Sequence, residues 1–226
     1  MPAPRYVYAV CRPFQQPLQA QLTGVAGQPP RQLTHHGLVA LYSVVPAAEF
    51  AEEELPGHLR DRAWRAETAR AHQGVVDALT AVTTPLPLAL ATVFRDDSAL
   101  RTMMEAREEH FRRTLDRLQG RAEWEVRAYA GPGTGGDEDF AGRLHTTLAA
   151  YAEDSRLRDP HGTAPPGPSE RTVLDAAYLV PRAACEEFVE LVKRSEGMNG
   201  GIPGTRVELS GPWAAYSFTG EEIPRP

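Results

Sequence analysis

The sequence has few of the residues that mark secreted, metal-binding or membrane-spanning proteins. Its 226 residues include only two cysteines, Cys11 and Cys185, which lie far apart and lack metal-ligand spacing. They make no disulfide framework, so both are predicted to be buried thiols. No window approaches the run of about twenty apolar residues that spans a membrane, and the apolar stretch near the N-terminus is too short for a signal peptide. We therefore expect a cytoplasmic protein.

Clustered positive charge is also missing. The formal net charge is −6, and Lys193 is the only lysine. Binding to nucleic-acid phosphates depends on clustered cations that release counterions. These features argue against a nucleic-acid partner, and nothing in the sequence indicates a membrane partner.

The spacing patterns of catalytic and metal sites are absent as well. None of the seven histidines falls in a paired spacing such as HExxH. The stretch GPGTGGDED at residues 131–139 lacks the GK[ST] ending of a phosphate-binding loop, so we interpret it as a linker. His72 lies beside the apolar stripe of a predicted helix, where a structural hydrogen bond is commoner than catalysis. We expect no catalytic, cofactor-binding or metal-binding residue, and no enzyme activity.

What the chain does contain is enough apolar sequence for two domains. The apolar fraction is 42%, which can build real cores at this length. In the N-terminal part, YVYAVC (residues 6–11) and LVALYSVV (residues 38–45) are typical of strands, the second buried on both faces. Helix formers dominate from about His58 to Val82. Proline then breaks the pattern, so we predict an N-terminal α+β domain over residues 1–84.

The rest of the chain offers a strand, a helix and a strand twice. The first set is Leu86–Phe94, a helix from Asp97 to Gln119, and the alternating strand EWEVRAY at residues 123–129. The second set is residues 172–180, a helix over residues 182–195, and a strand from Thr205 running on to Phe218. Right-handed crossovers would join these four strands into one sheet with both helices on one face. We therefore predict a ferredoxin-like C-terminal domain over residues 85–226, with a Pro/Gly-rich insertion at about 131–171.

One aromatic group near the C-terminus could have either of two roles. Trp213, Tyr216 and Phe218 lie close together in the last predicted strand. Aromatic side chains dominate both cores and interface anchors. We favour a core-sealing role over a partner-contact surface for these three residues.

Five stretches in sequence order resemble one family, the gas vesicle protein F/L family of accessory proteins of gas-filled organelles in bacteria and archaea. These stretches are YVYAV, ARAHQGVVDAL (residues 69–79), PLALATVF (residues 87–94), EWEVRAY and, most specific, LSGPWAAYSF (residues 209–218). The chain departs from the family at Ala89 and Ala91, where a pattern like PLRFGTVF carries an arginine and a glycine.

The resemblance implies a cytoplasmic, gas-vesicle-associated protein of two α+β domains, the second ferredoxin-like, without enzyme activity or cofactor. It also implies a role in gas vesicle assembly through contacts with the shell protein and other accessory proteins. From the residues alone, a small-molecule-binding regulatory module on a ferredoxin-like fold remains the alternative, because this fold hosts many functions.

Overall fold

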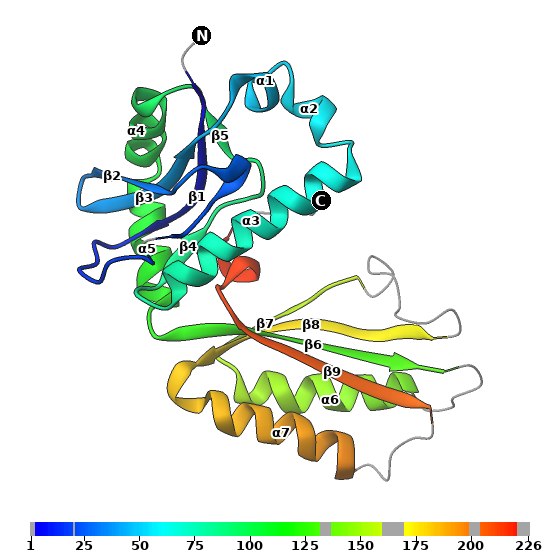
Figure 1. Ribbon diagram of the computed structural model, residues 1–226. Helices are drawn as coiled ribbons and strands as arrows, with labels where there is room; N and C mark the ends of the chain where they lie inside the picture. The colour runs from blue at the N-terminus through cyan, green and yellow to red at the C-terminus, as the bar shows by residue number, and fades with distance from the viewer. Residues whose placement is uncertain (1–2, 20, 132–136, 160–169, 199–203, 221–226) are drawn as a thin grey trace. The chain divides into compact units, whose positions relative to one another are not determined.

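The structure is a computed structural model that describes residues 3–19, 21–131, 137–159, 170–198 and 204–220. Contacts divide the chain into two compact units. The first runs to Gln119 and takes in the described residues from Phe218 onward, and the second is Gly120–Ser217. The fold is α+β, with an antiparallel sheet in each unit (Figure 1). Within the described ranges, no helix is both long enough and apolar enough to cross a membrane.

The first unit builds its sheet around β1. Its strands are β1 (Arg5–Cys11), β2 (Arg31–His35), β3 (Leu38–Val44), β4 (Pro85–Pro87) and β5 (Val93–Phe94). Its helices are α1 (Ala47–Phe50), α2 (Leu55–His58), α3 (Arg62–Thr80), α4 (Asp97–Ala106) and α5 (Glu108–Leu118), with a short 3-10 turn, η1, at Val25–Gly27. The strand order is β2-β3-β1-β4, and β5 pairs with the other end of β1.

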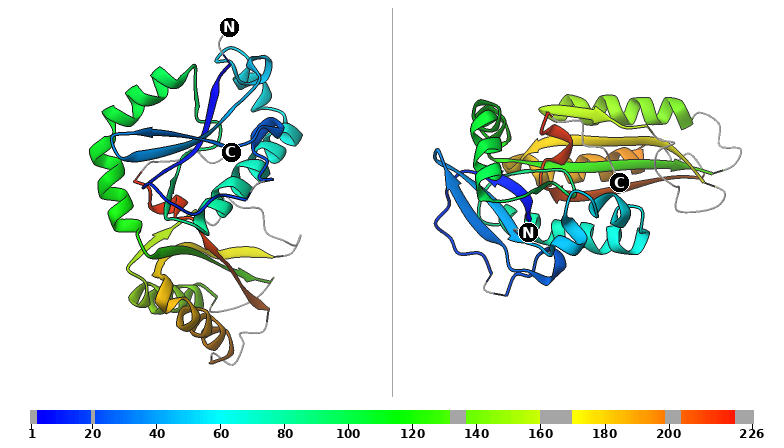
Figure 2. Two further views of the ribbon diagram at one scale, coloured as in Figure 1. Left: turned by 60° about the vertical axis from the view of Figure 1, so that its left-hand side comes forward. Right: turned by 90° about the horizontal axis from the view of Figure 1, so that it is seen from above.

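Helices cover both faces of this first sheet. On one face, α4 and α5 pack through Leu100 and Phe111 against β1 and β4, and on the other α3 places His72 against Tyr6 of β1. Figure 2 (left) shows the sheet between α3 and the α4–α5 pair. The prediction that the strand at residues 38–45 is buried on both faces is confirmed, because β3 is buried from Leu38 to Ser43.

The predicted sheet partner of Leu86–Phe94 was wrong. β4 and β5 pair antiparallel with β1 in the first sheet, with Leu86 opposite Val10 and Phe94 opposite Arg5. The following helix also packs on the first sheet, and it breaks at Arg107 into α4 and α5. The predicted boundary at residues 84 and 85 therefore falls inside the first unit. The physical reason is that the side of β1 away from β3 needs a strand to hydrogen-bond with, and β4 supplies one.

The second unit is a four-stranded sheet with both helices on one face (Figure 1). Its elements are β6 (Arg121–Ala130), α6 (Asp137–Tyr151), β7 (Asp154–Leu157), β8 (Arg171–Pro181), α7 (Cys185–Met198) and β9 (Thr205–Trp213), with 3-10 turns η3 (Arg182–Ala184) and η4 (Tyr216–Phe218). The strand order is β7-β8-β6-β9. Trp124, Tyr178 and Phe188 lie in the core between sheet and helices.

The segment predicted to be an insertion supplies two of these elements. Residues 131–171 contain α6, which packs on the sheet through Phe140 and Leu148, and β7, which pairs with β8. Helix α6 takes up Asp137–Tyr151 of this segment. The Pro/Gly-rich residues 160–169, and residues 132–136 of the predicted linker, lie outside the described residues. The helix and strand of this segment thus replace the pair predicted at Leu86–Gln119.

Candidate interaction site on the second sheet

Strand β6 divides its side chains between two environments, as its alternating sequence predicts. Trp124 and Val126 point into the helix-covered core, so Glu123, Glu125 and Arg127 take the opposite, polar face of the sheet. In a half-buried strand, such a charged face lies towards the solvent. The structure buries Glu123 instead, at 2% exposure, and a buried carboxylate requires partners.

Those partners form a buried ion cluster around Arg158, which follows β7. We call Arg158 with Glu123, Glu125, Arg127 and Asp175 the Arg158 cluster. The Arg158 guanidinium donates to Glu123 Oε1 at 2.8 Å and to Glu125 Oε1 at 2.5 Å, and lies 3.6 Å from Asp175 Oδ1. Arg127 donates to Asp175 Oδ2 at 3.4 Å. The Arg158 side chain is only 10% exposed and that of Asp175 is fully buried, so each charge depends on the others.

The same cluster holds the C-terminal segment of the second unit. Ser217 donates from its backbone N–H to Glu123 Oε2 at 2.8 Å and from its hydroxyl to Glu123 Oε1 at 2.7 Å. Arg158 also donates to Ser217 Oγ at 2.6 Å. Burial raises the pKa of Glu123, while the hydrogen bonds from Ser217 and the charge of Arg158 act in the opposite direction. The segment after β9 is therefore fixed to β6 and to the end of β7.

The chemistry of the Arg158 cluster suits it to hold parts of the second unit in position. Its three carboxylates are each bound by one or both of its two guanidinium groups. Arginine stays protonated at any physiological pH, so it can neither accept nor release a proton in a reaction cycle. In the described part of the chain, no group of three or more His, Cys, Asp and Glu residues is placed to hold a metal ion.

At the outer end of the same polar face, β9 presents a smaller charged group. Arg206 and Glu208 form an ion pair with each other. The Arg206 guanidinium lies 4.7 Å from the ring centroid of Tyr129, and the Tyr129 hydroxyl donates to Glu208 Oε2 at 3.0 Å. These contacts tie both charged side chains to Tyr129 of β6.

The three aromatic residues singled out from the sequence lie in different settings. Trp213 ends β9 opposite Glu123 and is half-buried, with its indole N–H donating to Ser210 Oγ at 3.4 Å. Tyr216 is also half-buried, whereas Phe218 is fully buried and belongs to the first unit. Core sealing and partner contact for this group both stay predictions.

The other residues weighed from the sequence are packed in their own units. His72 is 4% exposed and its Nδ1 lies 3.0 Å from the Tyr6 hydroxyl. Cys11 is buried, and burial raises the pKa of its thiol to about 12. Cys185 is half-buried at the start of α7 and accepts a hydrogen bond from the Trp124 indole at 3.2 Å.

Sequence reasoning missed the members of the Arg158 cluster outside β6. Arg158 lies in the segment that the sequence predicts to be an insertion, and its partner Ser217 lies between Tyr216 and Phe218 with no sequence signal of its own. Asp175 carried a usable signal, because it interrupts the otherwise apolar strand TVLDAAYLV. A charge in a buried strand calls for a partner of opposite charge, although it does not say where that partner lies in the sequence.

Comparisons with known families and proteins cover nearly the whole chain. The family model described as "Gas vesicle synthesis protein GvpL/GvpF" matches residues 4–135 and 134–220. "Gas vesicle protein L" of Streptomyces sp. (strain CB03234) is 41% identical over 251 residues, covering 96% of this chain and 92% of that protein. "Gas vesicle protein F" of the same strain is 29% identical over 213 residues, covering 93% and 81%.

Solved structures show the same fold. The crystal structure of the gas vesicle protein GvpF from Anabaena sp. PCC7120 matches with a TM-score of 0.75 at 17% identity, covering 96% of each chain. GvpF from Microcystis aeruginosa matches with a TM-score of 0.73, also at 17% identity, covering 96% of this chain and 99% of that one. The fold is therefore shared with these proteins.

Proposed function

This chain belongs to the gas vesicle synthesis protein GvpL/GvpF family and so has a role in gas vesicle formation, and we propose that it acts there as a non-enzymatic accessory or minor structural protein. Its partners are the gas vesicle shell protein and other accessory proteins, and it works in the cytoplasm in association with the vesicles. The observation that carries this proposal is the family match across residues 4–220.

The second unit supports a role based on protein contacts. Its element order β6-α6-β7-β8-α7-β9 and strand order β7-β8-β6-β9 are those of a ferredoxin-like domain, so we assign the unit to that class. Trp124, Tyr178 and Phe188 fill the space between sheet and helices. A small molecule on that face would have to displace the core, which argues against the regulatory-module alternative.

Edge strand β7 offers a place for the shell protein. It pairs only with β8 within the described residues, and Leu157 at its end is 63% exposed. A single exposed leucine is ordinary, but here it lies at the edge of the sheet, where a partner strand can add. Binding the shell protein there before it polymerises would cover apolar surface that otherwise aggregates.

Complementation tests the role directly. In a vesicle-forming host that carries both an L-type gene and an F-type gene of this family, the two genes are deleted in separate strains. The greater identity to protein L than to protein F, 41% against 29%, supports an L-type role. We therefore expect this chain to restore vesicles in the first strain and not in the second. Failure to restore vesicles in either strain would refute the proposed function.

A binding assay tests the mechanism. The purified chain should capture the shell protein, and Leu157→Glu should weaken that capture. The matched control is Glu190→Gln, an exposed residue of α7 whose side chain is 61% exposed, and it should bind as the unchanged chain does. Equal capture by all three forms would remove β7 as the contact, and capture by none would remove the shell protein as a direct partner.

A further inference from the structure

Strand β9 is the longest strand at the edge of either sheet. It has nine residues, against five in β2, four in β7 and three in β4. In the described parts of the chain, its only pairing is with β6. An edge strand presents a row of backbone N–H and C=O groups to which another strand can pair.

Two of the other edges are less suited to pairing along a long strand. Strand β4 has Pro85 and Pro87, which have no N–H to donate. Strand β7 has four residues, so it can pair with a short partner strand and not along a length such as that of β9. The edge of β9 has no proline before Pro212.

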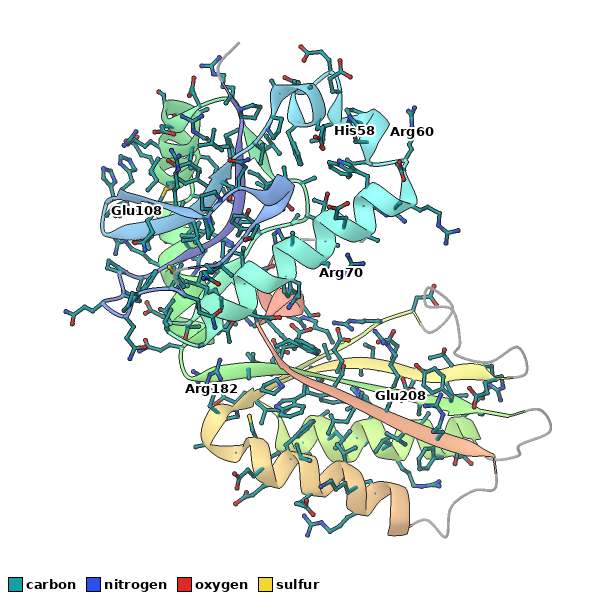
Figure 3. The ribbon with its side chains drawn as sticks, in the orientation of Figure 1. His58, Arg60, Arg70, Glu108, Arg182 and Glu208 are labelled. Carbon is teal, nitrogen blue, oxygen red and sulfur yellow. The ribbon has the colours of Figure 1, made fainter. Side chains whose placement is uncertain are left out.

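The charges of β9 are arranged so that they complement themselves. Arg206 and Glu208 lie on the polar face, one on each side of Val207, and their side chains are 41% and 45% exposed. Figure 3 shows Glu208 on this strand. Because Tyr129 contacts both side chains, they are held in place before any partner arrives.

The register of a self-pairing follows from these charges. In an antiparallel pair, side chains directly opposite each other lie on the same face of the sheet. When β9 pairs with its own copy, the two-fold axis therefore passes midway between one residue and the same residue of the second copy. An axis at Arg206 or at Glu208 sets a charge against its own copy, which is destabilising. An axis at Val207 sets Arg206 against Glu208 of the second copy, and Glu208 against Arg206. Axes further along set these charges against uncharged residues.

We propose that β9 pairs antiparallel with β9 of a second copy of this chain, in the register centred on Val207. The contact is isologous, so each copy supplies the same strand and the two four-stranded sheets join into one. Two opposite-charge pairs form across the axis, in addition to the main-chain hydrogen bonds. The proposal concerns the edge opposite β7, so the two contacts can be tested separately.

Charge reversal tests the pairing on the full chain. Arg206→Glu makes β9 acidic and Glu208→Arg makes it basic, so each variant alone sets like charges against each other. We expect each to weaken dimerisation by about tenfold or more, measured by sedimentation equilibrium. An equimolar mixture of the two should dimerise again, because the acidic strand then faces the basic one. The double variant R206E/E208R should also dimerise.

Matched controls separate the charge effect from misfolding. Lys193→Glu reverses an exposed charge on α7, away from β9, and should leave dimerisation unchanged. Circular dichroism and thermal unfolding establish that each variant is folded, and Arg206→Gln with Glu208→Gln provides a neutral pair if a reversal does not fold. A monomeric unchanged chain at high micromolar concentration overturns the proposal, as does a dimer that all the β9 variants leave intact.

A cross-link tests the register. A residue on the two-fold axis is the only one that faces its own copy, so Val207→Cys should form an intermolecular disulfide on oxidation. Ser210→Cys should not, because Ser210 faces a different residue in this register. If Ser210→Cys cross-links and Val207→Cys does not, the register is wrong. If the chain stays monomeric and binds the shell protein through β9, the self-pairing is wrong while the proposed function stands.

Discussion

The buried histidine of the first unit gives a prediction with a defined pH range. His72 is 4% exposed, and its Nδ1 lies 3.0 Å from the Tyr6 hydroxyl. Burial lowers the pKa of His72 from its ordinary 6.5 to about 4. The folded chain therefore keeps this imidazole neutral at pH values where the unfolded chain protonates it.

The direction in which pH changes the folding stability follows from the linkage between proton binding and folding. Above pH 6.5 both states hold a neutral imidazole, so the stability is fully present. As the pH falls from 6.5 towards 4, the unfolded state gains a proton that the folded state does not bind, and the stability is lost. A shift of this size corresponds to about 3 kcal/mol in full, of which about 2 kcal/mol is lost by a pH of about 5.

The assay compares the unchanged chain with His72→Gln. Glutamine is close in size, can still hydrogen-bond Tyr6, and does not titrate. Urea unfolding at a pH of about 7.5 and about 5 should show that the unchanged chain loses about 2 kcal/mol more than the variant. The other six of the seven histidines are common to both proteins, so the difference isolates His72. Equal losses would refute the reasoning, as would an NMR titration giving His72 a pKa near its ordinary value.

Four further substitutions test local packing and charge by denaturant unfolding. Ala91 has a φ of 63°, so Ala91→Gly should stabilise the chain by about 1 kcal/mol, and a loss of stability would contradict the strain. A Cβ on Gly24 would lie 2.2 Å from the Tyr8 hydroxyl oxygen, so Gly24→Ala should lower the free energy of unfolding by about 2 kcal/mol. Gly74 on α3 faces open space, so Gly74→Ala should raise the free energy of unfolding by about 0.5–1 kcal/mol. Similar effects at both sites would count against the clash at Gly24. Arg158→Met leaves buried carboxylates short of a partner and should cost about 3 kcal/mol, while a cost under about 1 kcal/mol would mean that the cluster is well solvated.

The sequence was sufficient for elements whose pattern is decided locally. The alternation of EWEVRAY identified β6 and its two faces, and the apolar run at residues 38–45 identified β3 as a doubly buried strand. The start of α4 was also readable, because Asp96 accepts a hydrogen bond from the Ala99 N–H at 2.8 Å, as a helix cap does. In each case the residues involved lie within a few positions of one another.

Pairing between distant elements was not readable in the same way. The apolar stripe of α4 and α5 fits any sheet, and nothing local says whether Leu100 covers β1 or β6. The prolines of β4 are a partial signal, because residues without an N–H suit a short edge strand such as β4 more than the middle of a sheet. Local sequence does not predict the Arg158 cluster either, because Arg158 and Glu123 are 35 positions apart and meet only when the sheet forms.

The two departures from the family pattern lie in one turn, and the geometry explains one of them. Thr92 closes the turn by donating to the Ala89 carbonyl from its N–H at 3.2 Å and from its hydroxyl at 2.7 Å. Between them Ala91 has a φ of 63° and donates its N–H to the Tyr6 hydroxyl at 3.2 Å. A left-handed conformation favours glycine. The backbone conformation of this turn therefore accounts for the glycine of the family pattern, without a role in a binding site. In this chain Ala91 adopts the left-handed conformation at some cost in stability, because the hydrogen bonds to Ala89 and Tyr6 hold the turn in place.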